Sequence, residues 1–249
     1  MELFLDFCQQ NFIIDNKDNK VAKIAEVFKE KKCLIIFDDL QNIFSKNQFC
    51  GEYKTEYQEY ENFFKTIAEI EHQSHIILIS QEKCPTMQSF NSNSSDCIEL
   101  SGLYSLEIIK NLGKYNHQEW LKLINLYEGN INYIQDIRIL IKDIFNGDVK
   151  EFLAEENIVI TPNIKLTLDN IFNRLCDAEK KIINEFVKYE KPMTRQDLKR
   201  NLDLSAIDFI NGLNSLINRY LITKIEQNKT LFQLSPVFRE YVKTKTISI

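Results

Sequence analysis

The sequence predicts an α/β plus α fold with three parts: a small parallel-sheet core, a helical region and a C-terminal winged helix. Three observations lead to this prediction: two continuous apolar runs in the first third, helical patterns from residue 105 onward, and a closing order of three helices and a hairpin. The expected boundaries are 1–103, 104–165 and 166–249. With 249 residues, 44% of them hydrophobic and 27% charged, the chain can bury a sizeable core.

The α/β core is predicted from two apolar runs, 33–37 (Cys-Leu-Ile-Ile-Phe) and 75–80 (His-Ile-Ile-Leu-Ile-Ser). Continuous apolar runs are typical of parallel strands that are covered on both faces. Between them, over 52–72, Tyr, Phe and Ile recur at three- and four-residue spacing, which predicts a helix that packs one face on the sheet. Strand, helix and strand together predict a parallel crossover unit. A third short strand is expected at 96–100.

The remaining two parts are predicted from helical periodicity and turn signals. Gly113, Gly129 and Gly147 each follow a helical pattern and are expected to end a helix. The helices expected before residue 175 cover 105–112, 117–128, 130–145, 148–155 and 164–174. The last part should hold helices at 178–189, 194–201 and 205–219 and strands at 221–226 and 230–234. Three helices followed by a β-hairpin describe a winged helix.

The charge of the chain bears on its partners. A formal net charge of −5 argues against a general nucleic-acid or membrane-surface binder, although residues 167–249 alone carry a net +4. The candidate recognition helix, 205–219, has only Asp208 and Arg219 as charged residues. Helices that read DNA usually present several basic side chains, so this helix disfavours DNA binding, and a DNA-binding regulator stays open as an alternative.

The six cysteines and three histidines give no sign of a metal site or a disulfide framework. No two cysteines form a Cys-x-x-Cys pair, and His72, His75 and His117 lack metal-ligand spacing. The first residues do not form a signal peptide, and the longest apolar runs are far shorter than a membrane span. We therefore expect a cytoplasmic protein with buried, reduced thiols and no membrane partner.

Two carboxylates form the sharpest chemical signal in the sequence. Asp38 and Asp39 directly follow the first apolar run, and ligands of open α/β folds bind at this carboxyl edge of the sheet. Here Asp38 is the candidate ligand for Mg²⁺, and Asp39 is the candidate catalytic residue that orients an attacking water. Paired acids also occur at strand ends simply because they cap the turn, so this alternative stays open. The second run ends in Ser80, Gln81 and Glu82, at the same edge.

These motifs, in this order, resemble the NB-ARC module of STAND-type signalling NTPases, in the form found in bacterial and especially cyanobacterial proteins. Leu34–Asp39 is similar to the Walker B strand, and 72–83 resembles the second strand, which in the family ends in Thr-(Thr/Ser)-Arg-Glu. Further similar segments are 100–103 (Leu-Ser-Gly-Leu), 128–132 (Glu-Gly-Asn-Ile-Asn), 145–153, 175–179 and 232–242. The resemblance covers the chain from about residue 20 to residue 243.

The resemblance implies a partial P-loop NTPase core, an ARC-like helical domain and a winged helix, with ADP or ATP and Mg²⁺ as cofactors. It implies that Asp38 holds the metal and that Asp39 acts in catalysis. It also places Gln81 at the family's sensor position, and Gly129 and Ile131 in the helical motif that touches the nucleotide in relatives.

The chain departs from the family at the phosphate site. No Gly-x-x-x-x-Gly-Lys-(Ser/Thr) loop lies in the 32 residues before Cys33, Gln81 replaces an Arg, and Ile131 replaces a Pro. No Met-His-Asp triplet ends the winged helix. We therefore expect weak or no nucleotide binding, no hydrolysis by this chain alone, and a role through protein partners or a missing N-terminal segment of the module. A competent ATPase whose P-loop comes from elsewhere is the alternative.

Overall fold

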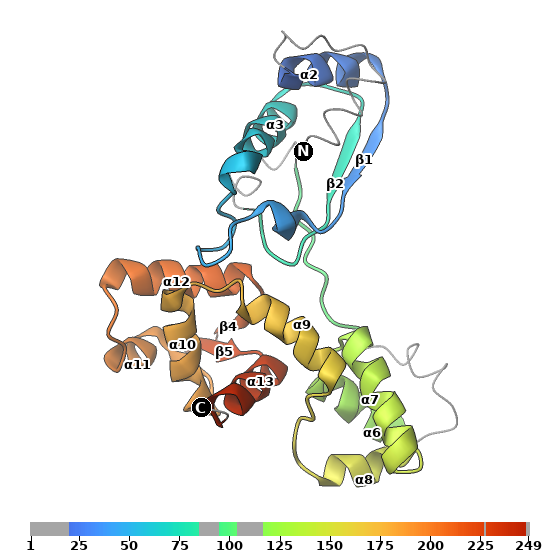
Figure 1. Ribbon diagram of the computed structural model, residues 1–249, viewed down its shortest axis with the longest axis vertical. Coiled ribbons are helices and arrows are strands. Elements are labelled where there is room, and N and C mark those ends of the chain that lie inside the picture. The colour runs from blue at the N-terminus through green and yellow to red at the C-terminus, as the bar shows by residue number, and fades with distance from the viewer. Residues whose placement is uncertain (1–19, 85–94, 104–116, 227, 248–249) are drawn as a thin grey trace. The chain divides into compact units, whose positions relative to one another are not determined.

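The computed structural model describes residues 20–84, 95–103, 117–226 and 228–247, and these form two compact units (Figure 1). The first unit extends to Ile98 and includes the short segment Asn218–Tyr220. The second unit comprises Glu99–Ile217 and Leu221–Ile249. Within the described residues, no helix is both long enough and apolar enough to cross a membrane.

A parallel pair of strands forms the centre of the first unit. The strands β1 (Leu34–Phe37) and β2 (His75–Leu78) pair in register from Leu34 opposite His75 to Phe37 opposite Leu78. The other elements of this unit are α2 (Lys20–Glu30), η1 (Leu40–Ile43), η2 (Thr55–Tyr57) and α3 (Gln58–Glu69). The predicted strand–helix–strand unit is thus confirmed, with the helix shorter than the 52–72 expected.

Aromatic side chains join the sheet of the first unit to α3. The Phe37 ring packs edge-on against Tyr60, Phe63 and Phe64, with ring centroids 5.8, 6.2 and 5.4 Å away. Phe63 also meets Phe28 of α2 in an edge-on contact. Edge-on geometry suits aromatic pairs because the positive rim of one ring faces the negative face of the other. The Tyr and Phe stripe is therefore a packing face, as predicted.

The other face of the β1–β2 sheet is open. Leu34, Ile36, Ile77 and Ile79 are 63%, 55%, 45% and 46% exposed, while the alternate residues pack on the helices. The prediction that both strands are buried on both faces is therefore wrong. Among the described residues, α2 and α3 pack on one side of this sheet, so a continuous apolar run here gives one covered face and one exposed face. The predicted strand at 96–100 is also wrong, because these residues have no regular structure.

The second unit is mainly helical. Its helices are α6 (His117–Leu126), α7 (Ile131–Ile144), α8 (Val149–Ala154), α9 (Pro162–Phe172), α10 (Asp177–Val187), α11 (Arg195–Arg200), α12 (Ala206–Asn218) and α13 (Pro236–Ile247). Asn130, Asp148 and Thr161 cap α7, α8 and α9, each accepting hydrogen bonds from amides of the first turn. Gly129 and Gly147 have φ of +67° and +85°, which confirms them at helix ends. Gly113 and the helix predicted at 105–112 lie outside the described residues.

A three-stranded antiparallel sheet completes the second unit. The strands β3 (Met193–Thr194), β4 (Ile222–Glu226) and β5 (Thr230–Leu234) lie in the order β3-β5-β4. The predicted hairpin is confirmed, and β3 and α13 are additional elements that the patterns did not give. One apolar core runs through this unit from the fully buried Trp120 and Tyr127 to Phe238 and Tyr241.

Candidate functional site

The two acids lie in a tight turn at the end of β1. Asp38 and Asp39 are exposed, and Asp39 has left-handed backbone angles, φ 52° and ψ 42°. The Asp39 amide donates a hydrogen bond of 2.9 Å to Asp38 Oδ1. A left-handed conformation is tolerated best by glycine and by short polar residues that bond locally, which suits an Asp here. The chain then returns to the sheet, because the Leu40 amide donates to the Ile79 carbonyl at 3.0 Å.

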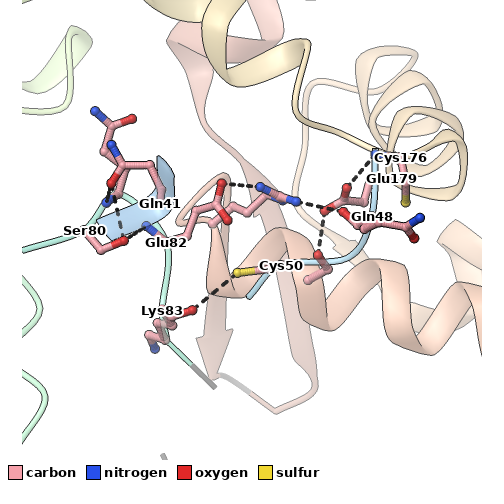
Figure 2. A network of polar contacts seen from close by, with 11 residues as sticks. Gln41, Gln48, Cys50, Ser80, Glu82, Lys83, Cys176 and Glu179 are labelled. Carbon is pink, nitrogen blue, oxygen red and sulfur yellow. Dashed lines mark hydrogen bonds and ion pairs between the residues drawn. The ribbon is translucent and has the colours of Figure 1, made fainter. Parts of the chain in front are cut away.

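Gln41 connects the acids to the end of β2. Its Nε2 donates to Asp39 Oδ1 at 2.9 Å, and its Oε1 accepts from the Gln81 amide at 3.1 Å and from Ser80 Oγ at 3.4 Å. The side chain is buried, with 6% of its surface exposed, and Figure 2 shows it beside Ser80. The structure therefore brings Asp39 and Gln81 together at the carboxyl edge of the sheet. Gln81 contributes its backbone amide, while its neutral side chain is exposed.

A buried ion pair continues this network. The Glu82 amide donates to Ser80 Oγ at 3.2 Å, and the Glu82 carboxylate pairs with the Arg219 guanidinium. The two side chains are only 5% and 2% exposed. Arg219 Nη2 also donates to the Gln48 carbonyl at 2.9 Å. Figure 2 shows how Glu82 and Gln48 lie around the guanidinium. Glu82 and Arg219 were not among the predicted site residues, and no local pattern in the sequence pairs two residues 137 positions apart.

Two further predicted site residues, Gly129 and Ile131, belong to the second unit. Gly129 lies in the turn between α6 and α7, where its backbone contacts Gly102 and Leu103, and its carbonyl accepts from the Leu103 amide at 3.0 Å. A Cβ atom on Gly129 would lie 2.6 Å from the Leu103 nitrogen. Ile131 is the first residue of α7 and is 37% exposed. The resemblance motifs at 100–103 and 128–132 therefore meet backbone to backbone.

Glu128, next to that turn, reaches the start of α13. Its Oε2 accepts a 2.5 Å hydrogen bond from Ser235 Oγ, and Ser235 Oγ in turn accepts from the Phe238 amide at 3.2 Å. Burial raises the pKa of the Glu128 carboxyl, and hydrogen bonds from Ser235 and the Val237 amide oppose that shift. Burial, followed by the negative charge of Glu128, raises the pKa of Tyr133 to about 12. A carboxylate of the chain itself thus caps α13.

The donor set at the end of β1 fits Mg²⁺ in a restricted way. Mg²⁺ is usually bound through one or two carboxylates, with waters and substrate phosphates as its remaining ligands. Asp38 and Asp39 supply two exposed carboxylates, and no group of three or more His, Cys, Asp or Glu residues gathers within the described part of the chain. These acids therefore suit a metal that arrives with a phosphate ligand better than a metal held by protein alone.

The solved structures show which fold the chain has. It matches the Walker-type ATPase PABY2304 of Pyrococcus abyssi with a TM-score of 0.55 and 14% identity, over 96% of this chain and 75% of that one. The chain has the fold of a Walker-type ATPase. A STAND protein with a tetratricopeptide repeat sensor from Pyrococcus horikoshii matches with a TM-score of 0.40 and 16% identity, over 97% of this chain and 33% of that one.

The sequence comparisons add one relative. An uncharacterized WD repeat-containing protein of Nostoc sp. is 28% identical over 255 residues, which is 98% of this chain and 20% of that protein. The chain therefore spans about a fifth of the length of this curated relative. No protein-family profile matches the chain.

Proposed function

We propose that this chain is the Walker B and sensor part of an NB-ARC-type signalling NTPase module, followed by its helical and winged-helix domains. The parallel β1–β2 pair, which ends in Asp38 and Asp39 and is joined through Gln41 to Gln81, carries the proposal. The likeness of the fold to a Walker-type ATPase supports it. The WD repeat-containing relative, of which this chain matches 20%, supports a place in a longer protein.

The role proposed for the two acids follows from their position. Asp38 would hold Mg²⁺ and Asp39 would orient a water molecule toward the terminal phosphate of a bound nucleotide. The metal would supply charge neutralisation between the phosphates. Gln41 holds the Asp39 carboxylate through a 2.9 Å hydrogen bond and thereby limits its orientation.

The same geometry predicts that the chain alone holds nucleotide weakly. Around the acids, the described side chains that enter the network are the neutral Gln41 and Ser80, and the cation Arg219 is buried against Glu82. A phosphate group needs backbone amides or cations, and each charge-assisted hydrogen bond contributes about 1.5–3 kcal/mol. We therefore propose that signalling proceeds through protein contacts, and that phosphate binding requires a P-loop-bearing segment.

Titration calorimetry of this chain with ADP, and with ATP and Mg²⁺, tests the proposal. We expect no heat of binding at micromolar nucleotide. We expect binding to appear when a P-loop-bearing strand and helix of a related module is fused ahead of residue 20, and to fall when Asp38 and Asp39 are both changed to Asn. Micromolar binding by the chain alone, or no binding by the fusion protein, would contradict it.

The candidate recognition helix adds little to the DNA-binding alternative. The one cation of the candidate recognition helix, Arg219, is 2% exposed and paired with Glu82. The exposed side chains of α12 include the apolar Ile207 and Ile210 beside the polar Asp208, Asn211 and Asn214. No exposed side chain of α12 is basic, which disfavours contact with a phosphate backbone. A gel shift at low salt that disappears at high salt would restore the DNA-binding alternative.

A further inference from the structure

A continuous chain of hydrogen bonds in the first unit links the acids to the segment Asn218–Tyr220. It runs from Asp39 through Gln41 to Ser80, and from Ser80 to the Glu82 amide. The Glu82 carboxylate then pairs with Arg219. All these residues belong to the same compact unit.

The segment Asn218–Tyr220 is held by more than this ion pair. The Lys83 amide donates to the Asn218 carbonyl at 2.9 Å, and Lys83 Nζ lies 5.3 Å from the centre of the Tyr220 ring. The segment is covalently continuous with α12, which ends at Asn218, and with β4, which begins at Ile222. An ion pair, a backbone hydrogen bond and a cation–π contact thus all hold this segment within the first unit.

Gln41 is the residue of this hydrogen-bond network whose side chain can change its orientation. Its amide has a donor end, bonded to Asp39, and an acceptor end, bonded to the Gln81 amide and Ser80. Because the side chain is 6% exposed, a bond lost at one end is not replaced freely by water. If the Asp39 carboxylate turns away from Gln41 Nε2, the Gln41 side-chain amide is favoured to reorient. The hydrogen bonds from Ser80 Oγ to Gln41 and from the Glu82 amide to Ser80 are then disturbed as well.

We propose that Gln41 is a positioning residue that couples the orientation of the Asp39 carboxylate to the hold on Asn218–Tyr220. In this arrangement, the two acids and the segment Asn218–Tyr220 are energetically coupled through Gln41, Ser80 and the Glu82–Arg219 pair. The coupling is a property of the folded chain and does not depend on nucleotide binding, so it can be tested separately from the proposed function.

The Lys83 amide provides a direct readout, since its hydrogen bond ends on Asn218. We would measure its hydrogen exchange by NMR in the full chain, with the His75 amide, bonded to the Cys33 carbonyl, as a gauge of the sheet. Gln41→Glu keeps the acceptor for Gln81 and Ser80 but places a carboxylate against Asp39. We expect Lys83 exchange to rise about fivefold or more, the lower end of typical coupling between sites.

Two further variants make the test specific. Asp39→Asn with Gln41→Glu exchanges donor and acceptor across the same bond, and should restore Lys83 exchange to within about twofold of the unmodified chain. Asn42→Ala changes an exposed neighbour in the same turn and should leave Lys83 exchange unchanged. Unchanged exchange in Gln41→Glu would overturn the proposal, and so would failure of the double variant to restore protection.

A second variant tests the coupling in the opposite direction, in case Gln41→Glu also destabilises the β1–β2 sheet. Coupling between two sites acts in both directions, so Glu82→Gln should raise exchange of the Asn42 amide, which donates to the Asp39 carbonyl at 2.9 Å. The His75 amide should stay protected in this variant. If Asn42 exchange does not change while Lys83 exchange rises, the ion pair is a local clamp and the proposal fails.

Discussion

Arg219 is the residue whose surroundings differ most from what its position in the sequence suggests. It follows an apolar helix, yet its guanidinium is 2% exposed and bonded to a carboxylate and a carbonyl. Buried ion pairs contribute modestly to stability as pairs, because desolvation offsets much of their attraction, but removal of one partner leaves an uncompensated charge. Loss of Glu82 should therefore destabilise the fold more than the net contribution of the ion pair, because it leaves the buried Arg219 charge without its carboxylate.

Glu82→Ala should lower the free energy of unfolding by about 3–5 kcal/mol, the range for an orphaned buried charge. Glu82→Gln combined with Arg219→Met should cost less than the sum of the two single changes, since neither charge is then left alone. Urea unfolding followed by circular dichroism measures both. Lys224→Met removes one partner of an exposed pair with Glu226 and should change stability by less than about 1 kcal/mol. Additive effects at 82 and 219 would contradict the burial of this pair.

At the scale of elements, the contact between Glu128 and α13 makes stability depend on pH. The folded pKa of Glu128 is raised because burial disfavours its charged form. The folded chain therefore binds this proton more tightly than the unfolded chain, and the contribution of Glu128 to stability falls as pH rises above its ordinary value of 4.5. Other carboxyls, such as Asp169 and Glu185, have lowered pKa values and act in the opposite direction.

Glu128→Gln isolates this effect because the amide oxygen can still accept from Ser235. We expect the unfolding free energy of the variant, relative to the unmodified chain, to increase between pH 4 and pH 8. Urea titrations at several pH values measure the difference, in which the titration of all shared carboxyls cancels. A difference that decreases with pH would mean that hydrogen bonding, rather than burial, dominates at Glu128.

The turn at Gly129 permits a backbone contact that any larger residue would break. Gly129→Ala introduces a Cβ 2.6 Å from the Leu103 nitrogen and 2.7 Å from the Gly102 carbonyl carbon, closer than van der Waals contact allows, at a positive φ. The left-handed backbone alone costs about 1–2 kcal/mol. We expect a larger loss of stability, and Gly129→Asn should be equally costly, although Asn tolerates this φ well. If Asn recovers most of the loss in thermal unfolding, the backbone angle and not the contact is limiting.

Most elements were predictable because their signals are local. The apolar period of 117–126 and 131–144, with Gly129 between them, gave α6 and α7 directly. The strand β3 was missed because it has two residues, and α13 was missed because the 232–242 segment was interpreted as a motif. Asp39 and Gln81 were predicted to lie at one sheet edge because each follows a strand of the same parallel pair. The contacts of Gln41 were not predictable, because they depend on the turn after β1. The Glu82–Arg219 pair was not predictable, because partners 137 positions apart leave no periodic pattern.

At the scale of the whole molecule, the open face of the β1–β2 sheet is the main unexpected property. Parallel sheets are normally covered on both faces, and contiguous exposed apolar groups favour association. Ile36→Thr with Ile77→Thr should change the free energy of unfolding by less than about 1 kcal/mol, because both side chains are about half exposed.

The same double variant should reduce self-association in sedimentation velocity, and should weaken binding to a P-loop-bearing segment supplied in trans. Ile139→Thr with Ile144→Thr serves as the matched control, since these exposed isoleucines lie on α7. If both double variants lower association equally, the sheet face has no special role as a docking surface.

The separation of Glu82 from Arg219 also has a consequence for biosynthesis. A ribosome that has just added Glu82 must add 137 more residues before the counter-ion of that carboxylate exists. At about 5–20 residues per second, this takes roughly 7–30 seconds. During that interval the Glu82 carboxylate lacks the Arg219 guanidinium. The region around Glu82 therefore reaches its final form only after the helices that precede Arg219 have been made.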